Sequence, residues 1–248
     1  MRMRVCVYAV ACLLAAVSQN LVAAKDDALR TTGAVDFVVL IDESLLNSGQ
    51  PKVPVENRKG ERVLVPYKDV FVYLDGRNPH VVKDWAKTFR RRKPRDIEFK
   101  ATDEAIVPFV ALSQVGDDVP MFAGDVPLGF VTVSNSPLGA AARPGDTFRF
   151  SKTELLPVEV CDVLRRHRSA WLLVVDHDVA TLTDNEGVAH FQDMPIDLEV
   201  TIRLAFPWLE KDVRLESSTL DFSKGVRVGL KIPEGPPIRH EIHILPRD

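Results

Sequence analysis

The sequence predicts an all-β protein built from sandwiches. Apolar runs of about four to eight residues recur along the chain, and Gly, Pro, Asn and Asp separate them. Short strands at this spacing are typical of β-sandwiches rather than of a parallel α/β sheet. Several runs alternate between apolar and polar residues, as residues 226–232 do, which buries one face of a strand and exposes the other.

The N-terminus has the three parts of a secretory signal peptide. Arg2 and Arg4 form a basic start, residues 5–17 are apolar, and Ala23 and Ala24 precede a charged segment. We therefore expect cleavage after residue 24 and a secreted or periplasmic protein. The alternative is an uncleaved anchor, but the apolar run is shorter than the roughly 18 residues of a spanning helix. We expect no transmembrane segment after signal cleavage.

The remaining elements follow from apolar periodicity. One helix is expected at residues 80–89, where Val81, Val82, Trp85 and Phe89 share a face. The expected strands are 34–41, 63–65, 70–74, 106–115, 130–133, 147–150, 158–161, 171–175, 188–191, 198–205, 213–222, 226–232 and 241–245.

Charge and cysteine content narrow the class of protein. The chain has 32 basic and 35 acidic side chains, and loss of the signal peptide makes its charge more negative. An acidic balance argues against nucleic acid as a partner, because nucleic acids select basic faces. The basic run at residues 90–95 is expected to be a solvated loop rather than a patch for anions or membranes. Two of the three cysteines lie in the signal peptide, so Cys161 remains alone and forms no internal disulfide.

The order of several fragments resembles a known family. The runs 70–74, 107–119, 157–162 and 170–177 look like those of exported cupredoxin-like proteins of the methylamine-utilisation type. The following segment 180–195 is similar to a carboxypeptidase-regulatory-like, or transthyretin-like, β module. The resemblance implies a cupredoxin-like Greek-key sandwich at residues 25–175 and a smaller β-sandwich at residues 176–248.

The resemblance also implies where copper ligands would stand. In that family a thiolate and two imidazoles hold copper in a plane, with a weak axial thioether. The first histidine's position falls on Gly129, the thiolate on Cys161, the second histidine on Leu164, and the methionine on His167 or Arg168. Only Cys161 keeps a ligand of the expected kind, so the implied copper site is degenerate.

Cys161 has three possible uses on this reading. The commonest is a small apolar side chain that fills the sandwich core. The second is a metal site rebuilt from Cys161 and His167, with His80, His177 or His190 as a further donor. The third is a reactive thiol beside a basic loop. His177 lies between Asp176 and Asp178, which we expect to raise its pKa in a turn at a strand end.

No pattern in the sequence indicates an enzyme. The chain lacks a serine nucleophile elbow, a phosphate-cradling glycine loop and a zinc-protease helix. We therefore expect an exported, non-catalytic binding or structural protein without a cofactor, whose partner is an unknown protein or cell-surface component. The alternative is a copper-binding electron-transfer or metal-delivery protein that uses Cys161 with rebuilt histidine ligands.

Overall fold

The computed structural model describes residues 32–46, 63–88, 95, 97–132, 137–138, 143–165, 168–208, 213–215 and 226–246. Within these ranges the protein is all-β and forms sandwiches, which confirms the fold class expected from the sequence. The exceptions in the described residues are one α-helix, α2 (His80–Lys87), and a short 3₁₀ helix, η1 (Glu43–Leu45). None of the described helices is both long enough and apolar enough to cross a membrane.

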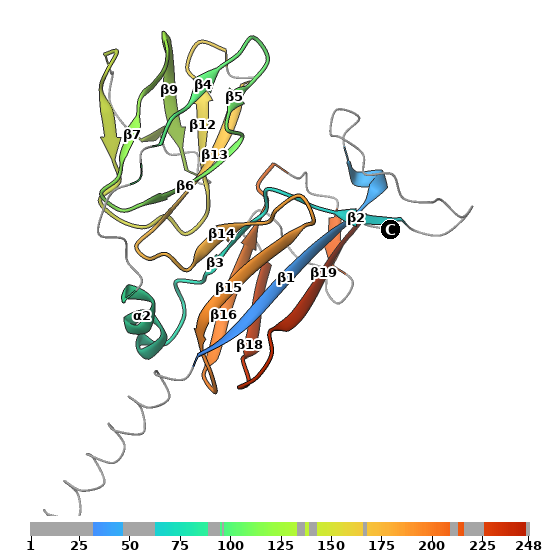
Figure 1. Ribbon diagram of the computed structural model, residues 1–248. Helices are drawn as coiled ribbons and strands as arrows, with labels where there is room; N and C mark the ends of the chain where they lie inside the picture. Colours follow the sequence, from blue (N-terminus) through green and yellow to red (C-terminus); the bar gives the residue numbers. More distant parts are fainter. Residues whose placement is uncertain are drawn as a thin grey trace, which may run out of the picture.

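Strands from both ends of the chain form one sandwich, which we call the parent sandwich (Figure 1). In its first sheet the order is β15-β1-β19-β17, and β2 also pairs with β1. These strands are β1 (Thr32–Asp42), β2 (Leu64–Pro66), β15 (Val188–Pro195), β17 (Val213–Leu215) and β19 (Ile238–Pro246). In its second sheet the order is β14-β3-β16-β18. These strands are β3 (Phe71–Leu74), β14 (Ala180–Leu182), β16 (Glu199–Ala205) and β18 (Val226–Lys231).

The parent sandwich has its own hydrophobic core. β1 is central to it, because β1 pairs antiparallel with β15 and parallel with β19. Its side chains Phe37 and Ile41 are fully buried and pack with Ile202 of β16. Helix α2 contributes Val82 and Trp85 to the same core. Val82 and Trp85, from the apolar face that predicted this helix, are therefore buried, and Val81 is partly buried against the same core.

The middle of the chain forms a second sandwich, which we call the inserted sandwich. Its main sheet has the order β10-β9-β12-β13-β6, and β8 also pairs with β9. Two further sheets of this sandwich have two strands each, β7 with β11 and β4 with β5. Its strands are β4 (Lys100–Ala101), β5 (Ile106–Val107), β6 (Val110–Gln114), β7 (Asp118–Pro120), β8 (Phe122–Ala123), β9 (Val126–Val131), β10 (Pro137–Leu138), β11 (Thr147–Arg149), β12 (Val158–Asp162) and β13 (Ser169–Val175). Phe130, Phe148 and Phe150 pack against one another in its core, with ring centroids 4.9 to 5.8 Å apart.

The two sandwiches are nested rather than consecutive. β1 and β3 find their hydrogen-bonding partners beyond residue 175, in β15, β19, β14 and β16. The sheets therefore group residues 32–88 with residues 180–246, and this grouping differs from the expected modules at 25–175 and 176–248. The physical reason is backbone pairing: neither half of the parent sandwich can complete its sheets without the other.

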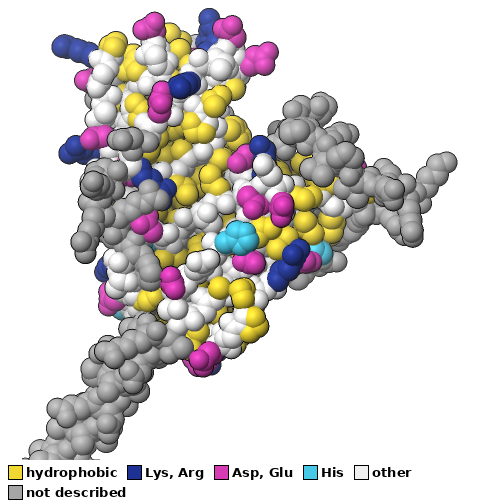
Figure 2. Space-filling model, viewed as in Figure 1, with side chains coloured by type: hydrophobic (Ala, Val, Ile, Leu, Met, Phe, Trp, Pro, Cys, Tyr) yellow, Lys and Arg dark blue, Asp and Glu magenta, His cyan; other side chains and the backbone are white. Residues whose placement is uncertain are grey.

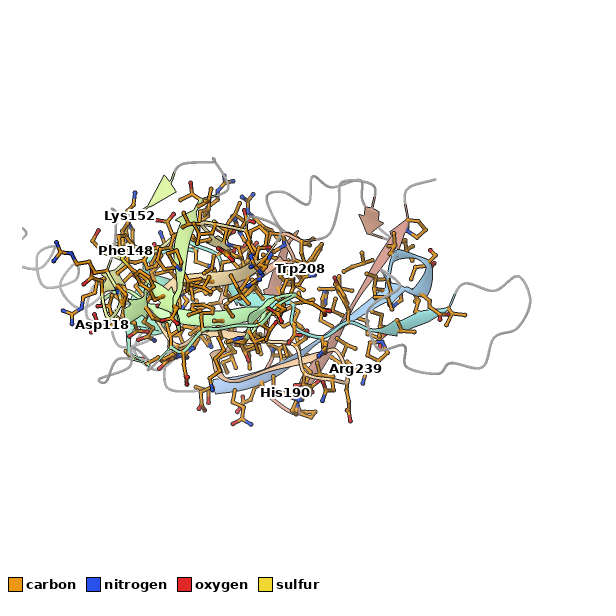
Figure 3. All side chains as sticks on the ribbon, turned by 90° about the horizontal axis from the view of Figure 1, so that it is seen from above. Asp118, Phe148, Lys152, His190, Trp208 and Arg239 are labelled. Atoms are coloured by element: carbon orange, nitrogen blue, oxygen red, sulfur yellow. The ribbon has the colours of Figure 1, made fainter. Side chains whose placement is uncertain are left out.

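Side chains from both sandwiches meet at a junction. Trp208 of the parent sandwich contacts Phe71 and also Phe109 of the inserted sandwich, with ring centroids 6.0 and 5.2 Å apart. Figure 3 shows Trp208 between Phe148 of the inserted sandwich and Arg239 of the parent sandwich. The Tyr73 hydroxyl donates a hydrogen bond to the Leu155 carbonyl at 2.9 Å. Apolar and polar contacts thus join the sandwiches.

Some element boundaries differ from those expected. The helix begins at His80 as predicted, whereas its expected last residue, Phe89, lies outside the described residues. β9 begins at Val126, four residues before the expected strand. Leu128 and Phe130 are buried in alternation, but Pro127 and Gly129 between them made this part of the strand hard to recognise in the sequence. Of the strand expected at 213–222, residues 213–215 form β17, and the others lie outside the described residues.

Candidate functional site

Cys161 lies on the face of β12 that points away from the core. Val158 and Val160 are fully buried, whereas Glu159 and Cys161 are half-buried, as the period of two in a strand requires. Cys161 pairs with Gly129 of β9 on one side and with Ser169 of β13 on the other. Its Sγ lies 3.5 Å from the Gly129 carbonyl oxygen, to which it donates. The prediction that Cys161 fills the sandwich core is therefore wrong.

The structure brings one of the implied copper positions next to the thiol. A Cβ atom at Gly129 would lie 3.3 Å from Cys161 Sγ and 3.3 Å from Val163 Cγ2. Gly129 offers no side-chain donor there, and Leu164 is apolar and 77% exposed. Arg168 is buried, and His167 lies outside the described residues. Among the described positions that the resemblance implies, only Cys161 has a side chain that binds metals.

His177 and Cys161 are not brought together. Cys161 pairs with Ser169 at the start of β13, whereas His177 follows the end of that strand. A strand rises about 3.3 Å per residue, so the two ends of β13 lie about 20 Å apart. Among the described residues, no group of three or more His, Cys, Asp or Glu side chains could hold a metal ion. His177 is therefore too far from Cys161 to be its further metal donor.

His177 occupies a buried turn. Its Nδ1 accepts a hydrogen bond from the Val179 N–H at 3.2 Å, which places the ring in the turn before β14. Burial lowers the pKa of His177, while the charges of Asp176 and Asp178 act in the opposite direction. The two aspartates act in the expected direction, but the pKa of His177 is lowered overall, because the loss of hydration outweighs their charges.

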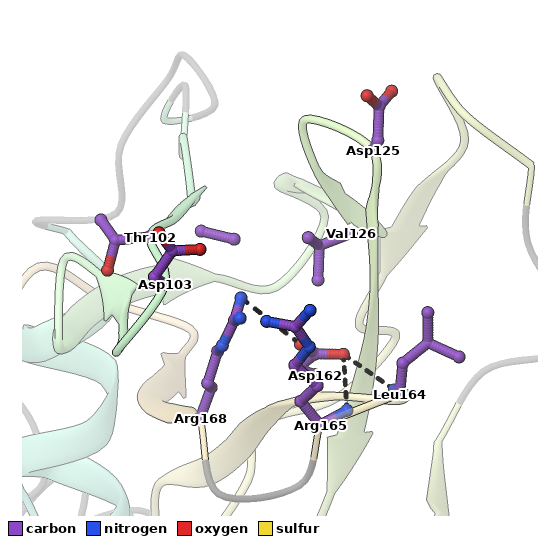
Figure 4. Close-up of a pocket in the computed structure, with 9 residues that line it drawn as sticks. Thr102, Asp103, Asp125, Val126, Asp162, Leu164, Arg165 and Arg168 are labelled. Carbon is purple, nitrogen blue, oxygen red and sulfur yellow. Dashed lines mark hydrogen bonds and ion pairs between the residues drawn. The ribbon is translucent and has the colours of Figure 1, made fainter.

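The loop after Cys161 is organised by a buried carboxylate. Asp162 Oδ1 accepts hydrogen bonds from the backbone N–H groups of Leu164, at 2.8 Å, and Arg165, at 3.0 Å. Its Oδ2 lies 3.7 Å from Arg168 Nη1 (Figure 4). Asp162 is 1% exposed and Arg168 is 4% exposed. Each of these charges is therefore buried beside the other.

A cavity of about 530 Å³ opens above this pair. Three segments of the inserted sandwich line it: the β4–β5 turn, the β8–β9 hairpin and the loop that follows β12 (Figure 4). The lining residues are Ala101, Thr102, Asp103, Asp125, Val126, Asp162, Leu164, Arg165 and Arg168. Sequence reasoning missed this site, although an aspartate directly before a loop of basic residues was a signal for a turn that it caps.

A second polar group lies on the exposed surface of the parent sandwich. His190 Nδ1 of β15 is 2.8 Å from Asp36 Oδ1 of β1, and its Nε2 is 4.0 Å from Asp184 Oδ2. Acidic and basic side chains are interspersed over the face of the molecule in Figure 2. Because this group is exposed and the Asp162–Arg168 pair is buried inside a cavity, the cavity is the stronger candidate for a functional site.

Comparison of the chain with protein-family models, curated proteins and solved structures finds no match. The resemblance to cupredoxin-like proteins therefore stays a prediction.

Proposed function

We propose that this chain is an exported, non-catalytic binding protein on a cupredoxin-like scaffold whose copper site is degenerate. The observation that carries the proposal is the pairing of Cys161 with Gly129. The position implied for a copper-binding histidine lies beside the thiol, but it is a glycine. A side chain there would crowd Sγ and Val163, which already occupy the space at 3.3 Å.

The side chains beside the thiol also support a site without copper. Arg165 and Arg168 follow Cys161 in the chain, and a guanidinium is not a ligand for copper. The inserted sandwich contains no histidine among its described residues, so the described imidazoles belong to the parent sandwich or to the junction. A planar copper site needs two imidazoles beside the thiolate.

The geometry of the thiol gives no support to a hydrolase. A cysteine nucleophile needs an imidazole within hydrogen-bonding distance and backbone donors for an oxyanion. Instead, Cys161 Sγ donates a hydrogen bond to a backbone carbonyl, which is too weak a base to deprotonate the thiol. The cavity, in contrast, has the size of a site for a small molecule. Binding is the function that these features support best.

Copper loading tests the proposal. The mature chain, residues 25–248, is titrated with Cu(II) and with Cu(I) under reducing conditions, and bound copper is measured after desalting. We expect no stoichiometric copper and no intense thiolate-to-copper absorption with Cu(II). The matched variants are Cys161→Ser and His167→Ala.

One copper ion per chain, with an absorption band that both variants abolish, would refute the degenerate site. That result would favour the alternative, a copper-binding electron-transfer or metal-delivery protein with Cys161 and His167 as ligands. Metal analysis of protein purified from its native compartment is the complementary measurement, because it does not depend on how the protein was loaded.

A further inference from the structure

The cavity beside the β12–β13 loop has the dimensions of a binding site. Its volume of about 530 Å³ lies within the range of roughly 300 to 1,000 Å³ that small-molecule sites occupy. Three separate segments of the inserted sandwich contribute charged side chains to it. Such convergence of a few polar groups in one concave site is what fixes the orientation of a bound molecule.

The described residues do not fully satisfy the guanidinium of Arg168. Its Nε has no hydrogen-bond partner among them. Its Nη1 lies 3.7 Å from Asp162 Oδ2, which is longer than the roughly 3.2 Å limit of a good hydrogen bond. Asp162 Oδ1 is already occupied by two backbone N–H groups. A guanidinium carries five N–H donors, and buried donors without an acceptor are unfavourable. A carboxylate would supply two acceptors in the matching geometry.

The rim of the cavity carries the opposite charge. Asp103 comes from the β4–β5 turn and Asp125 from the β8–β9 hairpin, and both are exposed. Figure 4 shows them on different sides of the cavity, with Arg168 and Asp162 below them. With Asp162 the lining contains three carboxylates against two guanidiniums. An inorganic dianion would be repelled by the rim, and a simple cation would leave Arg168 without an acceptor.

We propose that this cavity binds a small zwitterion, a molecule whose carboxylate contacts Arg168 and whose ammonium group lies between Asp103 and Asp125. The inference rests on the proposed binding function and names the chemical class of its ligand. Amino acids and short peptides with free ends have this chemistry. The ligand is recognised by both charges together rather than by either one alone.

Isothermal titration of the mature chain with four probes tests the proposal. Glycylglycine carries both charges, N-acetylglycylglycine only the carboxylate, and glycylglycinamide only the ammonium group, while sulfate is an inorganic dianion. We expect glycylglycine to bind and each of the other three probes to bind at least about tenfold more weakly, because each leaves one charged group of the site without a partner.

Three variants assign the binding to named residues. Arg168→Gln removes the carboxylate contact and should abolish measurable binding of glycylglycine. Asp103→Asn combined with Asp125→Asn changes only exposed side chains, so it tests the site even if Arg168→Gln fails to fold. This double variant should bind glycylglycine no more tightly than the unchanged chain binds N-acetylglycylglycine. Lys152→Gln, which removes an exposed cation of the inserted sandwich outside the lining, should bind like the unchanged chain.

Several results would overturn the proposed zwitterion site, and they can be told apart from one another. Equal binding of glycylglycine and the N-acetylated probe, or preferential binding of sulfate, would show an anion site and overturn the proposal. No binding of any probe would also overturn it. The Cys161→Ser variant separates this proposal from the proposed function, because Cys161 does not line the cavity. Copper bound through Cys161 together with unchanged glycylglycine binding would refute only the degenerate copper site.

Discussion

Arg203 and Asp75 form a fully buried ion pair where the two sandwiches meet. Asp75 Oδ2 lies 2.6 Å from Arg203 Nη2 and 2.7 Å from its Nε, and Arg227 Nε is 2.9 Å away. Arg203 Nη1 also donates to the Leu155 carbonyl of the inserted sandwich at 3.2 Å. Burial alone would raise the pKa of Asp75, but the hydrogen bond from the Arg77 N–H and the two arginines lower it overall. Asp75 therefore stays charged and holds the junction together.

Asp75→Asn should destabilise the protein strongly. The variant leaves Arg203 buried without a counter-charge, which typically costs about 3 to 5 kcal/mol. Urea unfolding, followed by tryptophan fluorescence, measures the free energy. The control is Asp118→Asn, which breaks an exposed pair with Arg149 and should change stability little. Similar stability losses in the two variants would contradict the role assigned to Asp75.

Asp162→Ala should loosen the loop after β12. The substitution removes the acceptor of two backbone N–H groups and the counter-charge of buried Arg168, and we expect a loss of about 3 kcal/mol or more. Amide hydrogen exchange should become faster at Leu164 and Arg165, whose N–H groups donate hydrogen bonds to Asp162. Asp125→Ala is the control from the rim of the same cavity. Unchanged exchange at these two amides would show that Asp162 does not organise the loop.

Gly187→Ala should be more disruptive than a similar change elsewhere. Gly187 has a φ of +73°, and a Cβ there would lie 2.5 Å from the Val39 carbonyl oxygen and 2.9 Å from the Tyr67 nitrogen. Backbone strain costs about 1 to 3 kcal/mol, and the clash adds to it. Gly116→Ala is the matched control, because its φ is +92° but its Cβ would meet nothing within 4 Å. Equal losses in thermal stability would rule out the close contact with β1.

Acidification should destabilise the protein through His177. Burial lowers the pKa of His177 in the folded state below the ordinary value of 6.5, so the unfolded chain takes up a proton first. The contribution of His177 is fully present above that ordinary pKa and is lost as the pH falls towards the folded pKa. The free energy of unfolding, measured from pH 8 to pH 5, should fall less steeply in His177→Asn. An equal slope in His177→Asn and the unchanged chain would contradict this role of His177.

Local periodicity was enough to predict the fold class and much of the secondary structure. The start of the helix at His80 was predictable because its apolar residues repeat at helical spacing over two turns. β18 was predictable from the alternation of apolar and polar residues at 226–232. The nesting could not be predicted in the same way. Val38 pairs with Glu241 and with Val188, and no local pattern records a partner so far away in sequence.

The candidate site was only partly predictable. The alternation Val158-Glu159-Val160-Cys161 contains the information that Cys161 and the core-facing valines point to opposite faces. The cavity is different, because Asp103, Asp125 and Arg168 come from three connections that only the fold brings together. Likewise, the sign of the pKa shift of His177 depends on its burial, which neighbouring residues in the sequence do not reveal.

The nested order also bears on how the chain assembles as it is synthesised. Trp85 and Val179 line the same small cavity, so the chain leaves the parent sandwich and returns to it at neighbouring points. The described strands of the inserted sandwich pair only with one another, so they can close as soon as β13 has emerged from the ribosome. β1 must wait for β15 and β19. β1 is thus made before the inserted sandwich but fixed after it, and its open edges need protection from wrong partners until β15 and β19 follow.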